Sequence, residues 1–360
     1  MRKTVIPFGP QHPVLPEPIH LKLTIVDERV VEAVPNLGYV HRGLERLADI
    51  RDFHQMIQVV ERVCGICSVI HALCYCQAVE EIMGVAAPPR AIYLRVMWSE
   101  LHRIQSHLLW LGLFADSFGF ESLFMQFWRI REKIMDISEA TTGNRVIVSV
   151  NVIGGVRRNP DAEQLRWVLG QLEWVEDELK RLDATMMDDY TVKKRTVGKG
   201  VLTRDQAYEL GAVGPTSRGS GVAQDIRQTG YAAYGDLCFE PVVETDGDCY
   251  ARARVRFREA LASIELIRLA INKLPEGEVR AKVKALKPPC GETVNRVEQP
   301  RGELLYYVKG SGEKNLDRVR IRTPTFANIP PLLVMLPGVY LSDVPVVTLS
   351  IDPCISCTER

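Results

Sequence analysis

The sequence has no excess of charge of either sign: 45 Lys and Arg residues balance 45 Asp and Glu residues in a chain of 360. A protein that binds nucleic acid needs a basic surface. The short basic run Lys193-Lys194-Arg195 is typical of a solvated loop rather than of such a surface. The charge balance therefore argues against a nucleic-acid partner.

Long hydrophobic runs are also missing. The most apolar late stretch, IPPLLVMLPGVYL, contains three prolines and is shorter than the ~20 residues that a bilayer requires. Prolines at 7, 10, 13, 16 and 18 prevent the apolar helix of a signal peptide. We therefore expect a soluble or peripheral protein in a reducing compartment, where its nine cysteines favour metal or redox chemistry over structural disulfides.

No Gly/Ser/Pro-rich linker and no internal repeat divides the chain, so one domain spanning residues 1–360 is expected. Alternation of apolar and polar residues predicts a β hairpin over residues 20–34, turning at Asp27-Glu28. Helical periodicity dominates from about residue 43 to 275, with apolar stripes over 90–112, over a helix capped by Asn159, and over 250–274. Residues 295–360 hold a second hairpin, around 310–312, and the terminal cysteines. The pattern predicts a mainly α (α+β) fold, with a large helical core and small β hairpins near both ends.

Two Cys-x-x-Cys pairs stand at opposite ends of the chain. Cys64 and Cys67 lie in ERVCGICSVI, and Cys354 and Cys357 lie in SIDPCISCTER, with 286 residues between Cys67 and Cys354. At the start of a helix, residues i and i+3 share a face, so we expect a helix from the first pair to Gly84 that points both thiols at one ion. Four thiolates suit zinc, an iron–sulfur cluster or another late transition metal.

The spacing alone leaves several interpretations open. A structural zinc usually joins pairs ~15–20 residues apart, and a thioredoxin-like redox pair sits in a βαβ unit, which neither pair does. Unrelated buried cysteines are a third alternative. The spacing favours a functional metal centre over structural zinc but does not identify the metal.

The sequence RVCGIC combined with a terminal DPCISCTER resembles the paired signature of nickel–iron hydrogenase large subunits. The resemblance covers most of the chain and is closest to the short, energy-converting (Ech-type) branch. The stretches GPQHPVLPEPIHL, GYVHRGLE and GPTSRGSGVAQDIRQ also resemble the quinone-site subunit of respiratory complex I, which lacks the four cysteines. The presence of all four cysteines distinguishes the two.

The resemblance implies a nickel–iron centre and a role for individual residues. Cys64 and Cys354 match the terminal nickel thiolates, and Cys67 and Cys357 match the thiolates that bridge nickel to iron. It further implies carbon monoxide and two cyanides on the iron. Splitting H2 needs a soft metal and a base, and Cys354 matches the first base.

Further positions match the surroundings of that centre. Glu17 matches the family's proton-relay glutamate, and Arg301 the arginine above the metal pair. Thr325, beside Pro324 in RTPTF, matches a hydrogen-bond donor to a cyanide. Read alone, Glu17 could equally be a surface residue, and the sequence PRG around Arg301 a simple turn. His71, just after the first pair, could line the site.

Glu45 in HRGLE matches a magnesium ligand of the respiratory-type relatives. Their second ligand is a C-terminal histidine, and this sequence has Arg360 there. A guanidinium cannot ligate a metal, so an ion pair between Arg360 and Glu45 is the alternative expectation to magnesium.

The remaining cysteines form no cluster-binding set, so electrons would have to leave through a partner. The resemblance implies a small iron–sulfur subunit carrying a proximal 4Fe-4S cluster, further iron–sulfur and antiporter-like membrane subunits, and ferredoxin as electron donor or acceptor. It implies a peripheral subunit on the cytoplasmic side of the cell membrane that forms H2 reversibly. The alternatives are a non-catalytic complex-I-like scaffold and a zinc-stapled structural subunit.

Overall fold

The computed structural model describes residues 3–282 and 287–360 and is mainly helical, with three small antiparallel sheets among these residues. This confirms the predicted fold class. The strands are β1 (Thr4–Phe8), β2 (His20–Val26), β3 (Arg29–Asn36), β4 (Asn151–Val152), β5 (Gly155–Val156), β6 (Cys290–Gln299), β7 (Gly302–Ser311) and β8 (Arg318–Arg322). The α-helices are α1 (Gln55–Glu61), α2 (Ser68–Met83), α3 (Pro89–Asp116), α4 (Glu121–Thr142), α5 (Ala162–Met187), α6 (Tyr190–Thr196), α7 (Arg204–Glu209), α8 (Pro215–Arg218), α9 (Cys249–Asn272), α10 (Pro324–Met335), α11 (Val344–Ser350) and α12 (Ile355–Glu359). The 3-10 helices are η1 (Leu44–Asp49), η2 (Ile226–Thr229), η3 (Tyr234–Asp236) and η4 (Leu341–Asp343).

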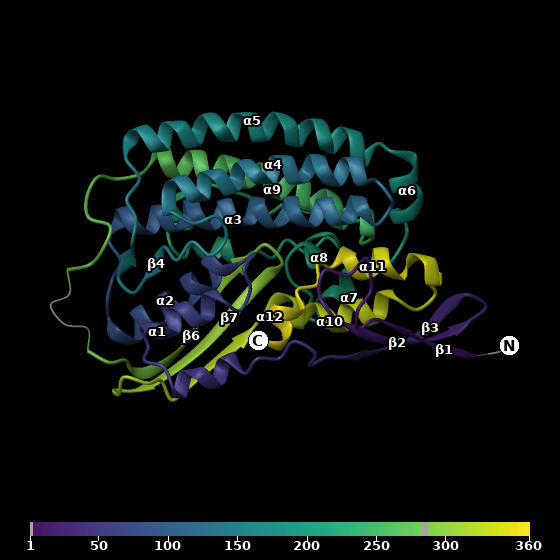
Figure 1. Ribbon diagram of the computed structural model, residues 1–360, viewed down its shortest axis with the longest axis horizontal. Helices are drawn as coiled ribbons and strands as arrows, with labels where there is room; N and C mark the ends of the chain where they lie inside the picture. Colours follow the sequence, from purple (N-terminus) through teal and green to yellow (C-terminus); the bar gives the residue numbers. More distant parts are fainter. Residues whose placement is uncertain (1–2, 283–286) are drawn as a thin grey trace.

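The four long helices α3, α4, α5 and α9 pack lengthwise as a bundle, in which α3 and α5 each contact both α4 and α9 (Figure 1). Each buries an apolar stripe in a common core, as the 3.6-residue periodicity predicts. The cap of α5 differs from the prediction: Asp161, not Asn159, is its N-cap, because the Asp161 carboxylate accepts from Gln164 N while the Gln164 amide contacts Asp161 N. Helix α4 lies within the predicted helical region of about residues 43–275, but no apolar stripe of its own was predicted for it.

Both predicted hairpins exist, and each is part of a three-stranded sheet. Near the N-terminus β2 and β3 turn through Asp27 and Glu28, which both have positive φ, and β1 is an additional strand beside β2. Near the C-terminus β7 pairs with β6 and β8. This second sheet packs against α2 (Figure 1).

The last residues of the chain lie against its N-terminal third. The Glu359 carboxylate accepts hydrogen bonds from Gly38 N at 2.6 Å and Val40 N at 2.5 Å. Arg42 donates to the Val63 and Ser356 carbonyls and so ties both cysteine segments together. These contacts place α12 beside the turn before α2.

Candidate metal centre

The structure brings all four predicted cysteine sulfurs into one buried cluster. The Sγ atoms of Cys64 and Cys354 lie 3.4 Å apart, and those of Cys67 and Cys357 lie 3.5 Å apart. Each pair joins one cysteine from the start of the chain to one from its end. None of the four residues is more than 6% exposed.

The first pair is placed by the turn that precedes α2. The helix begins at Ser68, so Cys67 occupies its N-cap position and Cys64 lies in the turn before it. The prediction of a helix beginning at the cysteine pair was therefore wrong by one turn. A turn lets the two thiols converge without sharing one helix face, which was the arrangement predicted from the i, i+3 spacing.

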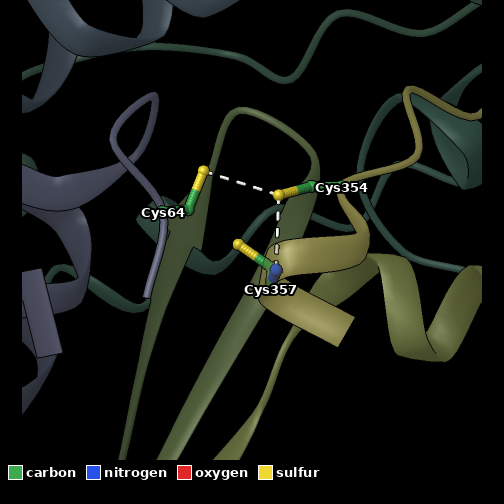
Figure 2. A group of neighbouring side chains, drawn as sticks. All are labelled: Cys64, Cys354 and Cys357. Carbon is green, nitrogen blue, oxygen red and sulfur yellow. Dashed lines mark hydrogen bonds between the residues drawn. The ribbon is translucent and has the colours of Figure 1, made fainter. Parts of the chain in front are cut away.

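The second pair is placed by a constrained segment ahead of α12. Asp352 has a φ of 55°, which is unusual for a residue other than glycine, and Pro353 follows it. Cys354 is the N-cap of α12, and its sulfur accepts a hydrogen bond from Cys357 N at 3.4 Å. Figure 2 shows Cys64 and Cys354 pointing toward each other, with Cys357 beside them.

The geometry fits a thiolate-bound metal pair. Metal–sulfur bonds of ~2.3 Å place two sulfurs on one ion roughly 3–4 Å apart, as seen in both pairs. The ligand atoms of Cys64, Cys354 and Cys357 lie within 4.8 Å of one another, and so do those of Cys67, His71 and Cys357. Cys357 belongs to both groups, as a residue shared between two metals would.

The thiols differ in how readily they ionise. Hydrogen bonds from neighbouring thiols, that of Cys354 first, hold the pKa of the Cys64 thiol well below its usual range. Burial raises the pKa of the Cys67 and Cys357 thiols. A bound cation is therefore needed before all four can be thiolates together.

His71 lies beside Cys357 in the sulfur cluster. Its Nε2 is 3.5 Å from Cys357 Sγ and 3.0 Å from the side-chain nitrogen of Gln299, and its Nδ1 is 2.7 Å from the Tyr306 hydroxyl. Burial lowers the His71 pKa to about 4, so the ring is neutral at neutral pH. The expectation that His71 lines the site is confirmed, whereas Gln299 and Tyr306 were not predicted.

A cavity of about 220 Å³ opens on one side of the sulfur cluster. Cys64 and Cys354 line it together with Glu17 and Arg301, whereas Cys67 and Cys357 do not. The rest of the wall is mostly apolar, and includes Ile66, Leu109, Trp110, Leu113 and Leu349. The cavity is therefore bordered by the first cysteine of each Cys-x-x-Cys motif, and most of its remaining wall is apolar.

Arg301 is held over this cavity by the β6–β7 turn. Its Nε donates to the Asp352 carbonyl at 3.0 Å, and its terminal nitrogen pairs with Asp352 Oδ1 at 2.9 Å. This turn packs tightly against the backbone at Gly214, whose φ is +66°. A Cβ on Gly214 would lie 2.2 Å from the Arg301 carbonyl oxygen, so the close approach requires glycine. Among the described residues, Arg301 Nη1 and Asp352 Oδ2 are both buried without a hydrogen-bond partner. The guanidinium nitrogen suits an anionic ligand or water, whereas the carboxylate oxygen suits a donor such as water.

Glu17 connects the N-terminal arm to the second cysteine pair. Its carboxylate accepts from the backbone N–H groups of Ile355 and Ser356, the latter at 2.9 Å, and from the Ser356 hydroxyl. Glu17 is half-buried while Cys354 is buried. Both line the cavity, so the carboxylate lies between the sulfur cluster and the outer part of the protein.

The sequence matches families of known proteins. Residues 117–289 and 281–360 match the family model of the 49 Kd subunit of respiratory-chain NADH dehydrogenase, and residues 42–113 match that of nickel-dependent hydrogenase. The carbon monoxide-induced hydrogenase of Rhodospirillum rubrum is 42% identical over the full length of both chains. The membrane-bound hydrogenase subunit alpha of Pyrococcus furiosus is 40% identical over 99% of this chain and 87% of that protein.

The chain belongs to the family of nickel–iron hydrogenase large subunits and their complex I counterparts. A solved structure agrees with this: a chain of the membrane-bound sulfane sulfur reductase, an archaeal respiratory membrane complex, superimposes with a TM-score of 0.95 at 32% identity. That match covers 99% of this chain and 98% of the other. Members of the family thus include proteins named as hydrogenases and a chain of a sulfane sulfur reductase complex.

Thr325 and Pro324 lie at the start of α10, next to the second cysteine pair. The Thr325 hydroxyl accepts from Cys354 N at 3.1 Å, and the residue is fully buried. The hydroxyl proton of Thr325 is not used in this hydrogen bond. Pro324 is the first residue of the helix and needs no backbone donor there.

Glu45 does not have the surroundings of a magnesium ligand. Its Oε1 accepts from Arg360 Nε at 3.0 Å and from Ile321 N at 2.9 Å, and its Oε2 pairs with Arg320 at 3.1 Å. Both oxygens are thus occupied by donors, and two guanidiniums supply the positive charge. The magnesium expectation is not supported by this geometry, and the alternative ion pair with Arg360 is confirmed.

We therefore expect the purified protein to contain no stoichiometric magnesium. Elemental analysis after gel filtration in magnesium-free buffer measures this directly, and a reading near one magnesium per chain would contradict it. The matched variant Arg360→His removes one guanidinium and restores a group that can ligate. It should gain magnesium only if Arg360 is what excludes the cation.

The other five cysteines, Cys74, Cys76, Cys238, Cys249 and Cys290, take part in none of the metal-ligand groupings found among the described residues. Cys238 and Cys290 are exposed, and Cys74, Cys76 and Cys249 are buried. Across residues 3–282 and 287–360, no helix combines the length and the apolar character needed to cross a membrane.

Proposed function

We propose that this chain is the catalytic large subunit of an energy-converting nickel–iron hydrogenase. In this proposal Cys64, Cys67, Cys354 and Cys357 hold the metal pair, with Cys67 and Cys357 bridging nickel and iron. The observation that carries it is the convergence of the four sulfurs, because only the cysteine-bearing members of such a family can hold this centre. When bound, the nickel–iron pair with its carbon monoxide and two cyanides supplies a soft, electron-rich site for heterolytic cleavage or formation of H2.

In this proposal, side chains of the protein accept and transfer the proton that is released from H2 or consumed in forming it. Cys354 lines the cavity and can hold the first proton at Sγ, whereas Cys67 and Cys357 lie away from it. Glu17 borders the same cavity and contacts Ser356, so its carboxylate can take that proton onward. Arg301 keeps a fixed positive charge over the cavity, which favours anionic ligands and developing negative charge.

The apolar wall supports a small, uncharged substrate. Ile66, Leu109 and Leu113 offer no hydrogen bond to a polar molecule, which suits H2. The same wall limits water near Cys354, so that protons move through side chains rather than through bulk solvent.

Electrons require partner proteins, because the cysteines outside the centre form no second cluster within the described part of the chain. We infer a small iron–sulfur subunit with a 4Fe-4S cluster close to the centre, ferredoxin as electron carrier, and further iron–sulfur and antiporter-like subunits that couple H2 formation to ion movement. The relatives named as membrane-bound support a position in a membrane complex, and we propose that the chain is a peripheral subunit on the cytoplasmic side of the cell membrane.

A second candidate is reduction of another substrate, which the likeness to the sulfane sulfur reductase structure favours. A third is a scaffold role, which the match to the 49 Kd subunit of respiratory-chain NADH dehydrogenase favours. An infrared spectrum of the purified complex separates these functions, because metal-bound carbon monoxide and cyanide absorb where proteins do not. We expect these bands together with about one nickel and one iron per large subunit at the thiolate site. Zinc in place of nickel, or no metal and no bands, would reject the hydrogenase proposal.

A further inference from the structure

A cluster of ionic side chains is completely buried beside β6. One of its members, Glu298, directly precedes Gln299 in that strand. It contains four carboxylates and three guanidiniums, none more than 3% exposed: Glu100, Asp225, Glu259, Glu298, Arg103, Arg218 and Arg227. The groups come from α3, α8, α9, β6, η2 and the loop that runs into η2. Nothing in the sequence pattern predicts that they meet.

Arg218 lies at the centre of this cluster. Its Nε pairs with Glu259 at 2.7 Å, while a single terminal nitrogen, Nη1, lies 2.9 Å from Glu298 Oε1 and 3.3 Å from Asp225 Oδ2. Arg227 binds Asp225 at 2.7 Å and Glu100 at 3.1 Å. Arg103 binds Glu100 at 3.1 Å, so every member is joined to the next.

The cluster has one carboxylate more than it has guanidiniums. His107 touches Glu259 at 3.0 Å, but burial lowers the pKa of this histidine, which favours its neutral form. Arg256 on the same helix is a further positive charge near Glu259, but the salt bridges of Glu259 are to Arg218 and His107. The Arg256 guanidinium faces Asp352 as well, lies over the Trp110 ring and donates to the Arg252 carbonyl. An unbalanced buried negative charge is costly, and binding a proton removes it.

The two carboxylates that share one nitrogen of Arg218 are unequally supported. Asp225 also accepts from the Arg227 Nε and backbone N–H at 3.0 and 2.9 Å. Glu298 accepts only one further hydrogen bond, from Ile226 N at 3.1 Å. Two neighbouring carboxylates favour one shared proton, and the less supported one takes it.

We propose that the Asp225–Glu298 pair holds one exchangeable proton, carried by Glu298, and acts as an internal proton store behind the metal centre. The position of Glu298 fits this role, because it belongs to the short segment 298–301. In the same segment Gln299 contacts His71 beside the sulfur cluster, and Arg301 lines the cavity. The use of the proton in H2 chemistry rests on the proposed function, whereas its presence on Glu298 does not.

The surroundings of Glu298 support a change of charge near neutral pH. Burial first, and then the charge of Asp225, raises the pKa of Glu298 to about 7, against the lowering effects of Arg218, Arg103 and Arg227. Glu259 is linked to Glu298 through Arg218, which forms a salt bridge with each of them. The Tyr231 hydroxyl accepts a hydrogen bond from the Glu298 backbone N–H at 3.1 Å. Glu298 is therefore protonated at mildly acidic pH and ionised at alkaline pH.

Infrared difference spectra of the whole complex between acidic and alkaline pH test this directly. Isotope labelling of glutamate identifies which carbonyl stretch belongs to a protonated glutamic acid. We expect one such band, disappearing with a midpoint at about 7, present in the wild type and absent in Glu298→Gln. The control Glu303→Gln should keep the band, because Glu303 is buried nearby but is paired with Arg322.

Asp225→Asn provides a second variant that leaves Glu298 in place. Removing the neighbouring charge should shift the midpoint of the band down by about one pH unit or more. The proposal is overturned if the wild type shows no glutamic acid band, if Glu298→Gln retains it, or if the midpoint is unchanged in Asp225→Asn. Metal-bound carbon monoxide and cyanide bands in the same samples report the proposed function separately, so each can fail alone.

Discussion

Replacing Cys357 by serine is expected to abolish H2/D+ exchange and to remove most of the nickel. Cys357 is the cysteine that belongs to both ligand groups, with its sulfur 3.5 Å from Cys67 Sγ and from His71 Nε2. A serine oxygen is a hard donor and does not ionise at neutral pH, so it cannot replace a thiolate shared by two soft metals. The loss should exceed the ~10–100-fold effect of removing a supporting hydrogen bond around a metal site.

Cys74→Ser is the matched control for this variant. Cys74 is buried too, and its thiol lies 3.4 Å from the Asn295 carbonyl, to which a serine hydroxyl can also donate. Nickel content and H2/D+ exchange should stay at wild-type levels in this control. Exchange that survives in Cys357→Ser would show that the thiolate-bound centre is not the site of H2 chemistry.

Glu17→Gln is expected to slow H2 formation by roughly 10²–10⁴-fold, the usual contribution of a positioned proton-transfer group. Glutamine retains an oxygen that can accept from Ser356 N, as Glu17 does at 2.9 Å, but it cannot carry a proton. Nickel content should therefore be unchanged, unlike in the cysteine variant. Exchange of H2 with solvent deuterons should fall together with H2 formation, whereas ortho–para conversion of H2 should persist.

Glu28→Gln is a suitable control for the Glu17 variant, because Glu28 lies at the exposed tip of the β2–β3 hairpin. It should leave all four measurements (H2 formation, nickel content, exchange with solvent deuterons and ortho–para conversion) unchanged. Full H2/D+ exchange in Glu17→Gln would mean that protons leave the cavity by another route. Loss of nickel in that variant would instead assign Glu17 a structural role in holding the second cysteine pair.

The sequence predicted the sulfur cluster because the donors occur as two short motifs whose residue types suit one kind of ligand. Fold class and the long helices followed from periodicity, since the stripes on α3, α5 and α9 face a common core. Glu17 and Arg301 were predicted from resemblance alone, and the structure places both on the wall of the same cavity as Cys354. The ion pair of Glu45 with Arg360 could be predicted from charge.

Other parts of the site had no local signal. Asp352 and Gln299 acquire their roles only when β6, α2 and the tail meet, and their residue types are common in surface turns. The buried cluster around Arg218 could not be predicted from the sequence either, because charged residues are ordinarily exposed. The start of α2 at Ser68 depends on how the turn is packed against the tail rather than on helix propensity.

The docking of the tail against residues 17–42 has a kinetic consequence. Half of the sulfur donors lie before residue 68 and half after residue 353, so the centre can form only when segments very distant in sequence come together. Opening of α12 alone would withdraw two of the four sulfurs at once, together with the contacts of Glu17 and Glu359. In the proposed metal centre, metal entry and metal loss should therefore both depend on the motion of this one short element, while the bundle of α3, α4, α5 and α9 remains folded.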